Sequence, residues 1–556
     1  MDPRLLRYYN QELAHLRDMG SEFAQQFPKI AARLGIEGIE VTDPYVERLL
    51  EGVGFLAARV QLKLDSEFPR FTQRLLEIVY PNYLAPTPAM LVAEFQPQLS
   101  ETNLAQGFTI PRGSSMRSQL GKGDSTACEF RTAQDVTLWP VQLVSAEYFS
   151  YAPDLPLTTL PIGKNVKGGV RLKLKTTAGL NFNQIGLDRL RIFLSGGDEV
   201  AYKLHELMLG APLGAVVAPA QRPWPWHTFL PARNIHSVGY ADEHALLPVS
   251  LRGFQGYRLL QEYFAFPQRF LFVDVDGLGP AVRKHAGDEL EVVLLFSRGE
   301  TSLESVVDVT NFSLFCAPAV NLFAKRADRI HLSDNTYDYH VVPDRTCPMD
   351  FEVYEVNGVT GYGVGSDSEQ TFLPLYGAYH TESRDHNAYF TVQREPRLLS
   401  AAQKRTGARS SYIGSEVFLS IVDPKEAPYA SDLRQLSVTT LCTNRDLPLQ
   451  MPLGIGKSDF TLDSAAPVEA IRCRRGPSKP YSPLAGGSIA WQFISHLSLN
   501  YLSLLASNER EGAAALREIL ELYAVTGDGG VKNQIEGVRG IQVKQITRRL
   551  PMPGPI

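Results

Sequence analysis

Apolar residues near the start of the chain recur every three or four positions, which is the spacing of one face of an α-helix. Charged residues such as Arg17 and Glu22 fall between them. The apolar members of this first stripe are Leu5, Tyr9, Leu13, Leu16, Phe23 and Phe27. The pattern predicts an amphipathic helix with one face free to pack against another helix.

A second stripe begins after Asp43 and Pro44. Aspartate is a good N-cap residue and proline fits the first position of a helix, so a helix should begin here. The apolar members are Val46, Leu49, Val53, Leu56, Val60 and Leu64. A shorter helical segment, residues 71–79, should follow and end before Pro81. The pattern leaves two interpretations open, because these helices could pack on one another or bind another protein.

After Pro81 the apolar period changes from about 3.6 residues to two, the period of a half-buried strand. The clearest example is residues 170–175, where Val170, Leu172 and Leu174 alternate with basic residues. Asn357-Gly358 is typical of a hairpin turn. Further strands are predicted at 190–194, 270–276, 290–296, 351–356 and 417–422, and late helical patterns at 491–505 and 513–523.

These patterns predict an α+β protein that is mainly β. N-terminal amphipathic helices are followed by several antiparallel β-rich domains and a late helical segment. A chain of 556 residues is too long for a single core, and the proline-rich stretch 81–88 is the clearest linker. We expect a helical region at 1–85, β-rich domains at 86–300 and 301–440, and a mixed α/β region at 441–556.

Charge and hydropathy narrow the class of partner. The net charge of −5 argues against a broad nucleic-acid surface. The local cluster of Arg472, Arg474 and Arg475 is better explained as a solvated surface or a protein contact. No apolar run reaches the roughly 18 residues of a membrane-spanning helix, and the N-terminus lacks the pattern of a secretory signal. We therefore predict a cytoplasmic protein without direct membrane insertion.

The sequence offers no convincing catalytic, cofactor or metal site. Its five cysteines are widely spaced, which argues against a disulfide framework or a zinc site. Gly456-Lys457-Ser458 resembles the end of a phosphate-binding loop, but Met451 stands where that motif needs glycine. We therefore expect no enzyme activity and no cofactor. A pair of glycosidase carboxylates stays open, because such residues meet only in the folded chain.

Several residue strings occur in a recognisable order along nearly the whole chain. They are Arg7–Leu13, Asp43–Leu50, Phe55–Gln61, Ile110–Gly113, Cys128–Thr132, Phe312–Phe323, Cys442–Pro448 and Trp491–Leu502. These strings resemble the TssF family, also called VasA or ImpG, which supplies a baseplate subunit of the bacterial type VI secretion system.

The resemblance implies a non-catalytic assembly protein that lies near the inner membrane through its partners. Two copies would join one TssG-like subunit in a wedge, bind a TssK-like adaptor and surround the spike hub, where the contractile sheath is nucleated. Contacts with a TssE-like subunit and the sheath are also implied. The two helical stripes would then bind TssG and the second copy. Family members usually continue beyond Arg548-Arg549 with a further strand-containing segment, whereas this sequence stops at Ile556. Two interpretations stay open, a shortened sequence or a different end, and so does any contact that such an end would make.

Five residues in two of these strings combine polar and apolar character: Asn321, Phe323, Asn444, Arg445 and Asp446. We expect a structural role, with Asn and Asp satisfying turn amides and Arg445 holding a carboxylate or carbonyl groups. Partner contact is the alternative. Two other functions stay open for the whole chain, a contractile phage tail or phage-derived injection particle and a β-rich carbohydrate hydrolase.

Overall fold

The structure is a computed structural model in which the chain forms two compact units; the described residues before Ala85 belong to the first and the other described residues to the second. The late helical pattern expected at 491–505 and the basic pair Arg548-Arg549 lie outside the described residues. The structure describes residues 3–33, 43–98, 100–121, 123, 125–152, 154–156, 160, 162–249, 255–333, 335–363, 369–375, 388–397, 410–423, 429, 431–483, 509–524 and 530–542.

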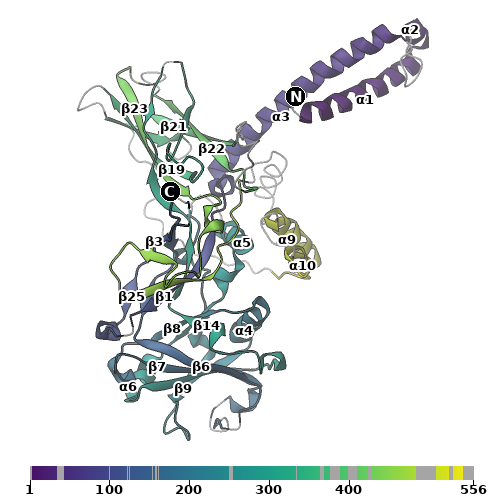
Figure 1. Ribbon diagram of the computed structural model, residues 1–556. Helices are drawn as coiled ribbons and strands as arrows, with labels where there is room; N and C mark the ends of the chain where they lie inside the picture. The colour runs from purple at the N-terminus through teal and green to yellow at the C-terminus, as the bar shows by residue number, and fades with distance from the viewer. Residues whose placement is uncertain are drawn as a thin grey trace, which may run out of the picture. The chain divides into compact units, whose positions relative to one another are not determined.

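The first unit is a helical hairpin in which α1 runs back along α3 (Figure 1). Asp43 caps α3 as expected, since its Oδ1 accepts a 2.9 Å hydrogen bond from the Tyr45 amide. The second stripe and the shorter segment predicted after it form one continuous helix. The elements are α1 (Pro3–Gln26), α2 (Pro28–Arg33), α3 (Pro44–Val79) and the 3₁₀ helix η1 (Pro81–Leu84).

A six-stranded antiparallel sheet lies at the centre of the second unit. Its two edges approach each other, because the Asp459 amide donates to the Ile471 carbonyl at 2.8 Å and Asp459 Oδ2 accepts from the Cys473 amide at 2.9 Å. Phe95, Phe130 and Phe460 fill the interior. The strands, in sheet order, are β24 (Phe460–Leu462), β3 (Ser115–Ser118), β4 (Glu129–Thr132), β15 (Cys316–Val320), β1 (Met90–Pro97) and β25 (Val468–Arg475).

The predicted boundaries at 300 and 440 cut through this sheet. β1, β3 and β4 come from the first predicted β-rich range, β15 from the second, and β24 and β25 from the C-terminal region. A two-stranded ribbon, β2 (Phe108–Ile110) with β5 (Val136–Leu138), belongs to the same part of the chain.

A five-stranded and a four-stranded antiparallel sheet share one core, to which Leu172 and Val292 contribute from one sheet and Ile192 and Val273 from the other. The predicted strand at 170–175 is confirmed, with its apolar residues buried and its basic residues half-buried. The elements are β10 (Thr228–Pro231), β9 (Pro212–Pro219), β13 (Glu289–Phe296), β7 (Gly168–Thr176) and β6 (Val141–Phe149), then β11 (Ile235–Ser237), β12 (Phe272–Asp276), β8 (Arg189–Leu194) and β14 (Phe312–Leu314), with helices α4 (Asp198–Gly210) and α6 (Gly279–Lys284).

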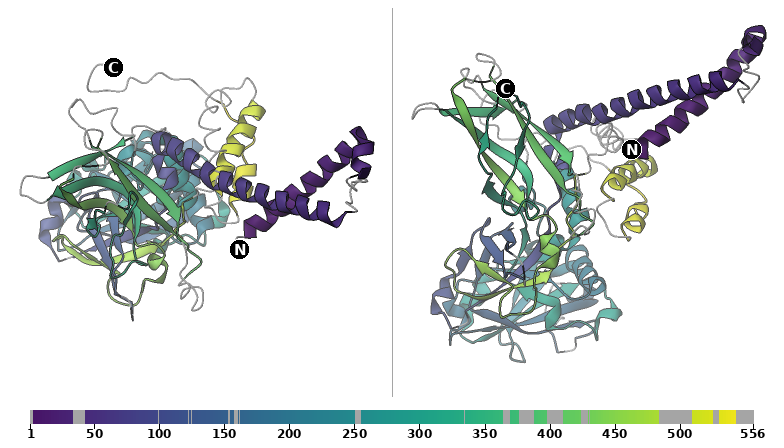
Figure 2. Two further views of the ribbon diagram at one scale, coloured as in Figure 1. Left: turned by 90° about the horizontal axis from the view of Figure 1, so that it is seen from above. Right: turned by 45° about the horizontal axis from the view of Figure 1, so that its top comes forward.

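An eight-stranded domain, formed by residues 323–443 alone, has its own core. The six-stranded sheet lies between this domain and the pair of five-stranded and four-stranded sheets (Figures 1 and 2). Within the eight-stranded domain, all strand pairs are antiparallel except β20 with β21. The strands are β16 (Phe323–Arg326), β17 (Ile330–His331), β18 (Tyr339–Val341), β19 (Glu352–Gly363), β20 (Glu369–Pro374), β21 (Tyr389–Pro396), β22 (Ser415–Val422) and β23 (Leu433–Thr443).

The hairpin turn predicted at Asn357-Gly358 is wrong. β19 continues through both residues, with Val356 opposite Thr440 and Gly358 opposite Thr439. Asn357 is therefore an extra residue in the strand, which is a β-bulge, and glycine, here Gly358, is common at bulges as well as in turns.

Three helices pack together elsewhere in the second unit: α5 (Gln255–Ala265), α9 (Glu509–Tyr523) and α10 (Val531–Glu536). The rings of Phe264 and Tyr523 stack with centroids 6.3 Å apart. The predicted α+β, mainly β fold class is thus confirmed. Among the described residues, no helix is long and apolar enough to cross a membrane.

Candidate functional site

The inner face of the helical hairpin forms a seam between α1 and α3. Gly54 and Ala58 of α3 are buried there, and half-buried Leu13 and Leu16 lie opposite. A Cβ atom on Gly54 would lie 3.7 Å from the Leu13 amide nitrogen and from Leu16 Cδ1, so a small residue lets the two backbones approach. Arg17 and Glu47 add an ion pair of 3.3 Å across the seam.

A different face of α3 carries apolar side chains that nothing in the described chain covers. We call Leu49, Val53, Leu56 and Val60 the outer stripe; they are 68%, 46%, 60% and 59% exposed. Their spacing of four, three and four residues is that of a coiled-coil seam. Exposed apolar surface of this kind marks binding sites on soluble proteins.

The other predicted stripe residues fall into three groups. Phe23 and Phe27 are exposed, with ring centroids 5.2 Å apart. The side chains of Leu5 and Leu64 lie outside the described residues. The half-buried members are Tyr9, Leu13, Leu16 and Val46.

The polar motif residues meet where the eight-stranded domain joins the six-stranded sheet. Fully buried Asn321 and Asn444 bond to each other twice: the Asn444 amide donates to Asn321 Oδ1 at 2.6 Å, and Asn321 Nδ2 donates to Asn444 Oδ1 at 2.8 Å. Both also bond to the backbone of Glu129 in β4, through its carbonyl at 2.8 Å and its amide at 3.1 Å. The two side chains thereby replace a rung of backbone hydrogen bonds.

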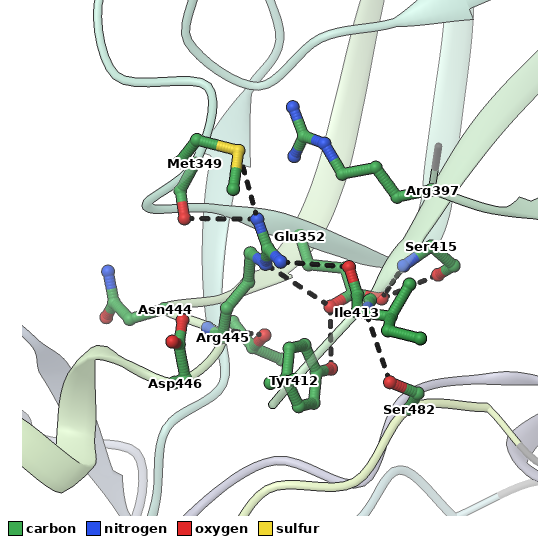
Figure 3. Close-up of polar contacts among 12 residues, drawn as sticks. Met349, Glu352, Arg397, Tyr412, Ile413, Ser415, Asn444, Arg445, Asp446 and Ser482 are labelled. Atoms are coloured by element: carbon green, nitrogen blue, oxygen red, sulfur yellow. Dashed lines mark hydrogen bonds and ion pairs between the residues drawn. The ribbon is translucent and has the colours of Figure 1, made fainter. Parts of the chain in front are cut away.

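Arg445 lies next to this pair and points back into the eight-stranded domain (Figure 3). Its backbone takes the left-handed conformation, with φ of 56°. Nη1 donates to the Met349 carbonyl at 3.2 Å, Nη2 donates to the Ile413 carbonyl at 3.0 Å, and Nε lies 4.0 Å from Glu352 Oε2. The planar guanidinium therefore connects three separate segments.

Glu352 is buried beside Arg445, and its carboxylate accepts several hydrogen bonds. Its Oε1 accepts from the amide and hydroxyl of Ser415 at 2.7 and 2.6 Å, and Oε2 accepts from the Tyr412 hydroxyl at 2.7 Å. Burial, with the nearby Glu352 charge, holds the pKa of Tyr412 well above its usual range. Tyr412 therefore stays protonated and donates its hydrogen bond at physiological pH.

The two remaining motif residues are also buried at this junction. Asp446 Oδ2 accepts a 2.5 Å bond from the Ser410 hydroxyl. Phe323 begins β16, and its ring packs edge-on against Phe351 at 6.2 Å. The structure thus brings all five motif residues together, and each described polar contact is within the chain. Whether any of them also meets a partner stays a prediction.

The basic cluster Arg472, Arg474 and Arg475 forms ion pairs within the chain. Each arginine of the basic cluster has an acidic partner, namely Arg472 with Asp459 at 3.3 Å, Arg474 with Glu94 at 2.9 Å and Arg475 with Asp198. Among the described residues, no group of three or more His, Cys, Asp or Glu could hold a metal ion.

A polar cleft of about 580 Å³ has three carboxylates in its lining, those of Asp135, Asp188 and Glu243. Two of them accept hydrogen bonds from backbone amides, Asp135 from Arg112 at 2.7 Å and Asp188 from Gly279 at 2.9 Å. These bonds give both side chains a structural role.

Comparison with known proteins decides between the hypotheses. The chain matches the family described as "Type VI secretion system, TssF" over residues 1–556. The chain belongs to the TssF family. It is 52% identical to the type VI secretion system component TssF1 of Pseudomonas aeruginosa, over 100% of this chain and 89% of that protein.

Solved structures share the TssF fold. One is a chain of the type VI TssK-TssF-TssG baseplate subcomplex determined by cryo-electron microscopy, with a TM-score of 0.66 and 22% identity over 91% of this chain and 87% of that one. Another is a chain of a type VI baseplate complex, with a TM-score of 0.53 and 22% identity over 98% and 88%.

Sequence reasoning did not find the buried charges that support the TssF fold elsewhere. Arg258 and Arg269 are buried with Glu262, whose Oε1 accepts from the Leu246 and Leu247 amides at 3.1 and 3.0 Å. The only signal in the sequence was the spacing of Arg258 and Glu262, four residues apart on a helix. Glu352, far from Arg445 in sequence, gave no signal at all.

Proposed function

We propose that this TssF-family chain is a structural wedge subunit of a type VI secretion baseplate in the cytoplasm. It would assemble with a TssG-like subunit, a second copy of itself and a TssK-like adaptor around the spike hub, and so help to nucleate the contractile sheath. Its position near the inner membrane would come from these partners. The observation that carries the proposal is the match to the TssF family along the whole chain.

The outer stripe is our candidate for the partner-binding surface. Four apolar side chains with coiled-coil spacing would bury their exposed area when a partner helix lies along α3. Burying one such side chain fully contributes about 1.5–3 kcal/mol. The exposed rings of Phe23 and Phe27 offer a second, smaller apolar surface on α1. The seam residues Gly54 and Ala58 are already covered and would hold the hairpin together.

Affinity purification of the tagged full chain, co-expressed with TssG-like and TssK-like proteins from the same gene cluster, tests this function. We expect a stable complex whose native mass gives more copies of this chain than of the TssG-like subunit. We also expect poor solubility for the chain expressed alone, because the outer stripe would be left exposed. A soluble, monodisperse chain that binds neither protein would contradict the proposal.

A further inference from the structure

The eight-stranded domain is an insertion into the six-stranded sheet. The chain leaves that sheet after β15 and returns to it before β24. Residues 323–443 are therefore joined to the sheet through their first and last strands, β16 and β23, which we call the stem. These strands start side by side, with Phe323 opposite Cys442. A domain attached by one two-stranded stem would swing freely unless further contacts held it.

We propose that Asn321 and Asn444 form a clamp that fixes the orientation of the eight-stranded domain on the six-stranded sheet, so that the two move as one rigid body. This goes beyond the proposed function, which concerns the helical hairpin. The clamp lies where the stem begins, because Asn321 is two residues before β16 and Asn444 directly follows β23.

Hydrogen-bond geometry supports the clamp. β4 and β15 pair up to Val320 opposite Arg131, and continued pairing would bring Leu322 opposite Glu129. Instead, the amide and carbonyl of Glu129 bond to the side chains of Asn444 and Asn321. Because these partners and the Asn444 amide are backbone groups, they settle which side-chain atom is oxygen and which is nitrogen. The clamp therefore connects the base of both stem strands to β4 of the six-stranded sheet.

Contacts around the stem act in the same direction. Thr126 of the six-stranded part donates to Asp350 Oδ2 at 2.7 Å, and the Gly414 amide donates to Ser482 Oγ at 3.1 Å. Gly414 has φ of 74°, and a Cβ there would lie 3.1 Å from Arg445 Nη2. Tethers at several separate points restrain tilting more strongly than the stem alone could.

Two isosteric substitutions distinguish the effect of losing the clamp's hydrogen bonds from a general loss of stability. In Asn321→Asp the donating Nδ2 becomes an acceptor, so two 2.8 Å bonds, to the Glu129 carbonyl and to Asn444 Oδ1, turn into contacts between oxygens. Asn444→Asp keeps the Oδ1 that accepts from Asn321 and Glu129, and only its 3.4 Å bond to the Asp350 carbonyl turns into a contact between oxygens. Both variants introduce one carboxylate at a fully buried position, so the two are matched in that cost. The first should release the domain, and the second is its matched control.

Spin labels at two exposed positions report the orientation, Tyr337 in the eight-stranded domain and Ile455 beside β24. Partly exposed Cys347 and Cys473 would first become serine in the full-length chain. We expect a narrow distance distribution for the unaltered chain and for Asn444→Asp, and a broad one for Asn321→Asp. A control pair at Tyr151 and Ile455, both outside the inserted domain, should not change. An Asn321→Asp distribution as narrow and as centred as that of the unaltered chain would overturn the proposal.

Hydrogen exchange gives a second test that does not depend on a folded variant. In the unaltered chain the Asn444 amide should be as protected as the strands of the six-stranded sheet. Where Asn321→Asp folds, a carboxylate oxygen still accepts from the Asn444 amide, but both bonds donated by Nδ2 are lost. That amide should therefore exchange about tenfold faster because the weakened clamp opens more often, the factor that corresponds to about 1.4 kcal/mol. Exchange of the Asn444 amide in the unaltered chain at the rate of exposed loops would refute the clamp.

Discussion

Single side chains at the junction of the two β domains replace backbone hydrogen bonds that the chain path interrupts. Asn321 and Asn444 do this by pairing with Glu129, and Arg445 does it by reaching the carbonyls of Met349 and Ile413. A buried polar group left without a partner costs about 1–3 kcal/mol, so each of these residues is hard to replace.

Arg445→Lys should lower the free energy of unfolding by about 1–3 kcal/mol. A lysine cannot span both carbonyls with one planar group, and at least one of them would lose its donor. Denaturant unfolding followed by fluorescence measures the loss. The control, Arg345→Lys, changes a side chain that is 64% exposed and should stay within about 0.5 kcal/mol. Equal effects at the two positions would argue against a special role for Arg445.

His205 should make the protein sensitive to mild acid. Burial on α4 lowers the pKa of His205 below its usual 6.5, opposed by a hydrogen bond with the Phe270 backbone. The unfolded chain therefore takes up the proton first, and stability is lost as the pH falls below about 6.5. His205→Gln should weaken this decline in urea midpoints between pH 7.5 and 5.5, whereas exposed His331→Gln should not. An unchanged decline in His205→Gln would refute the assignment.

Residue types at the junction were predictable, but their partners were not. Asparagine, arginine and aspartate among apolar neighbours indicated buried hydrogen bonding, and the structure places those residues at one site. Glu352 and Tyr412 were not found, because nothing local in the sequence tells a buried carboxylate or phenol from an exposed one.

At the scale of elements, α3 has two apolar faces with different roles. One face, with Gly54 and Ala58, is buried against α1, and the other is the outer stripe. The spacing of apolar residues predicted the helix, but it assigned both faces to a single stripe, because residues such as Val46 lie between them. The same limit explains the bulge at Asn357, where local composition could not distinguish a turn from an irregular strand.

Gly54→Ala should stabilise the hairpin by about 0.5–1 kcal/mol, because alanine favours helix and its Cβ would make only ordinary contacts of 3.7 Å. Gly52→Ala, with open space around it, is the control and should give a similar gain. Gly54→Leu should separate α1 from α3. Amide exchange of α1 in the full chain measures all three, and full protection in Gly54→Leu would contradict the seam.

At the scale of the whole molecule, the sequence predicted the class of fold but could not predict how distant segments combine. The six-stranded sheet joins strands from residues 90–132, 316–320 and 460–475, and the eight-stranded domain is inserted between two of those segments. Pairing over such separations leaves no local pattern. The proposed function therefore rests on family membership, and the structure shows which surfaces are candidates for binding other subunits.

We propose that this chain works by presenting surfaces to other subunits, above all the outer stripe of α3. The most direct test is the affinity of Leu56→Asp with Val60→Asp for the co-expressed TssG-like subunit. Two unpaired charges in a desolvated interface should weaken binding at least about a hundredfold, while circular dichroism shows intact β domains. Arg59→Asp, which changes an exposed residue of α3 that is not a member of the outer stripe, should bind normally. Binding of the double variant at the affinity of the unaltered chain would contradict the account.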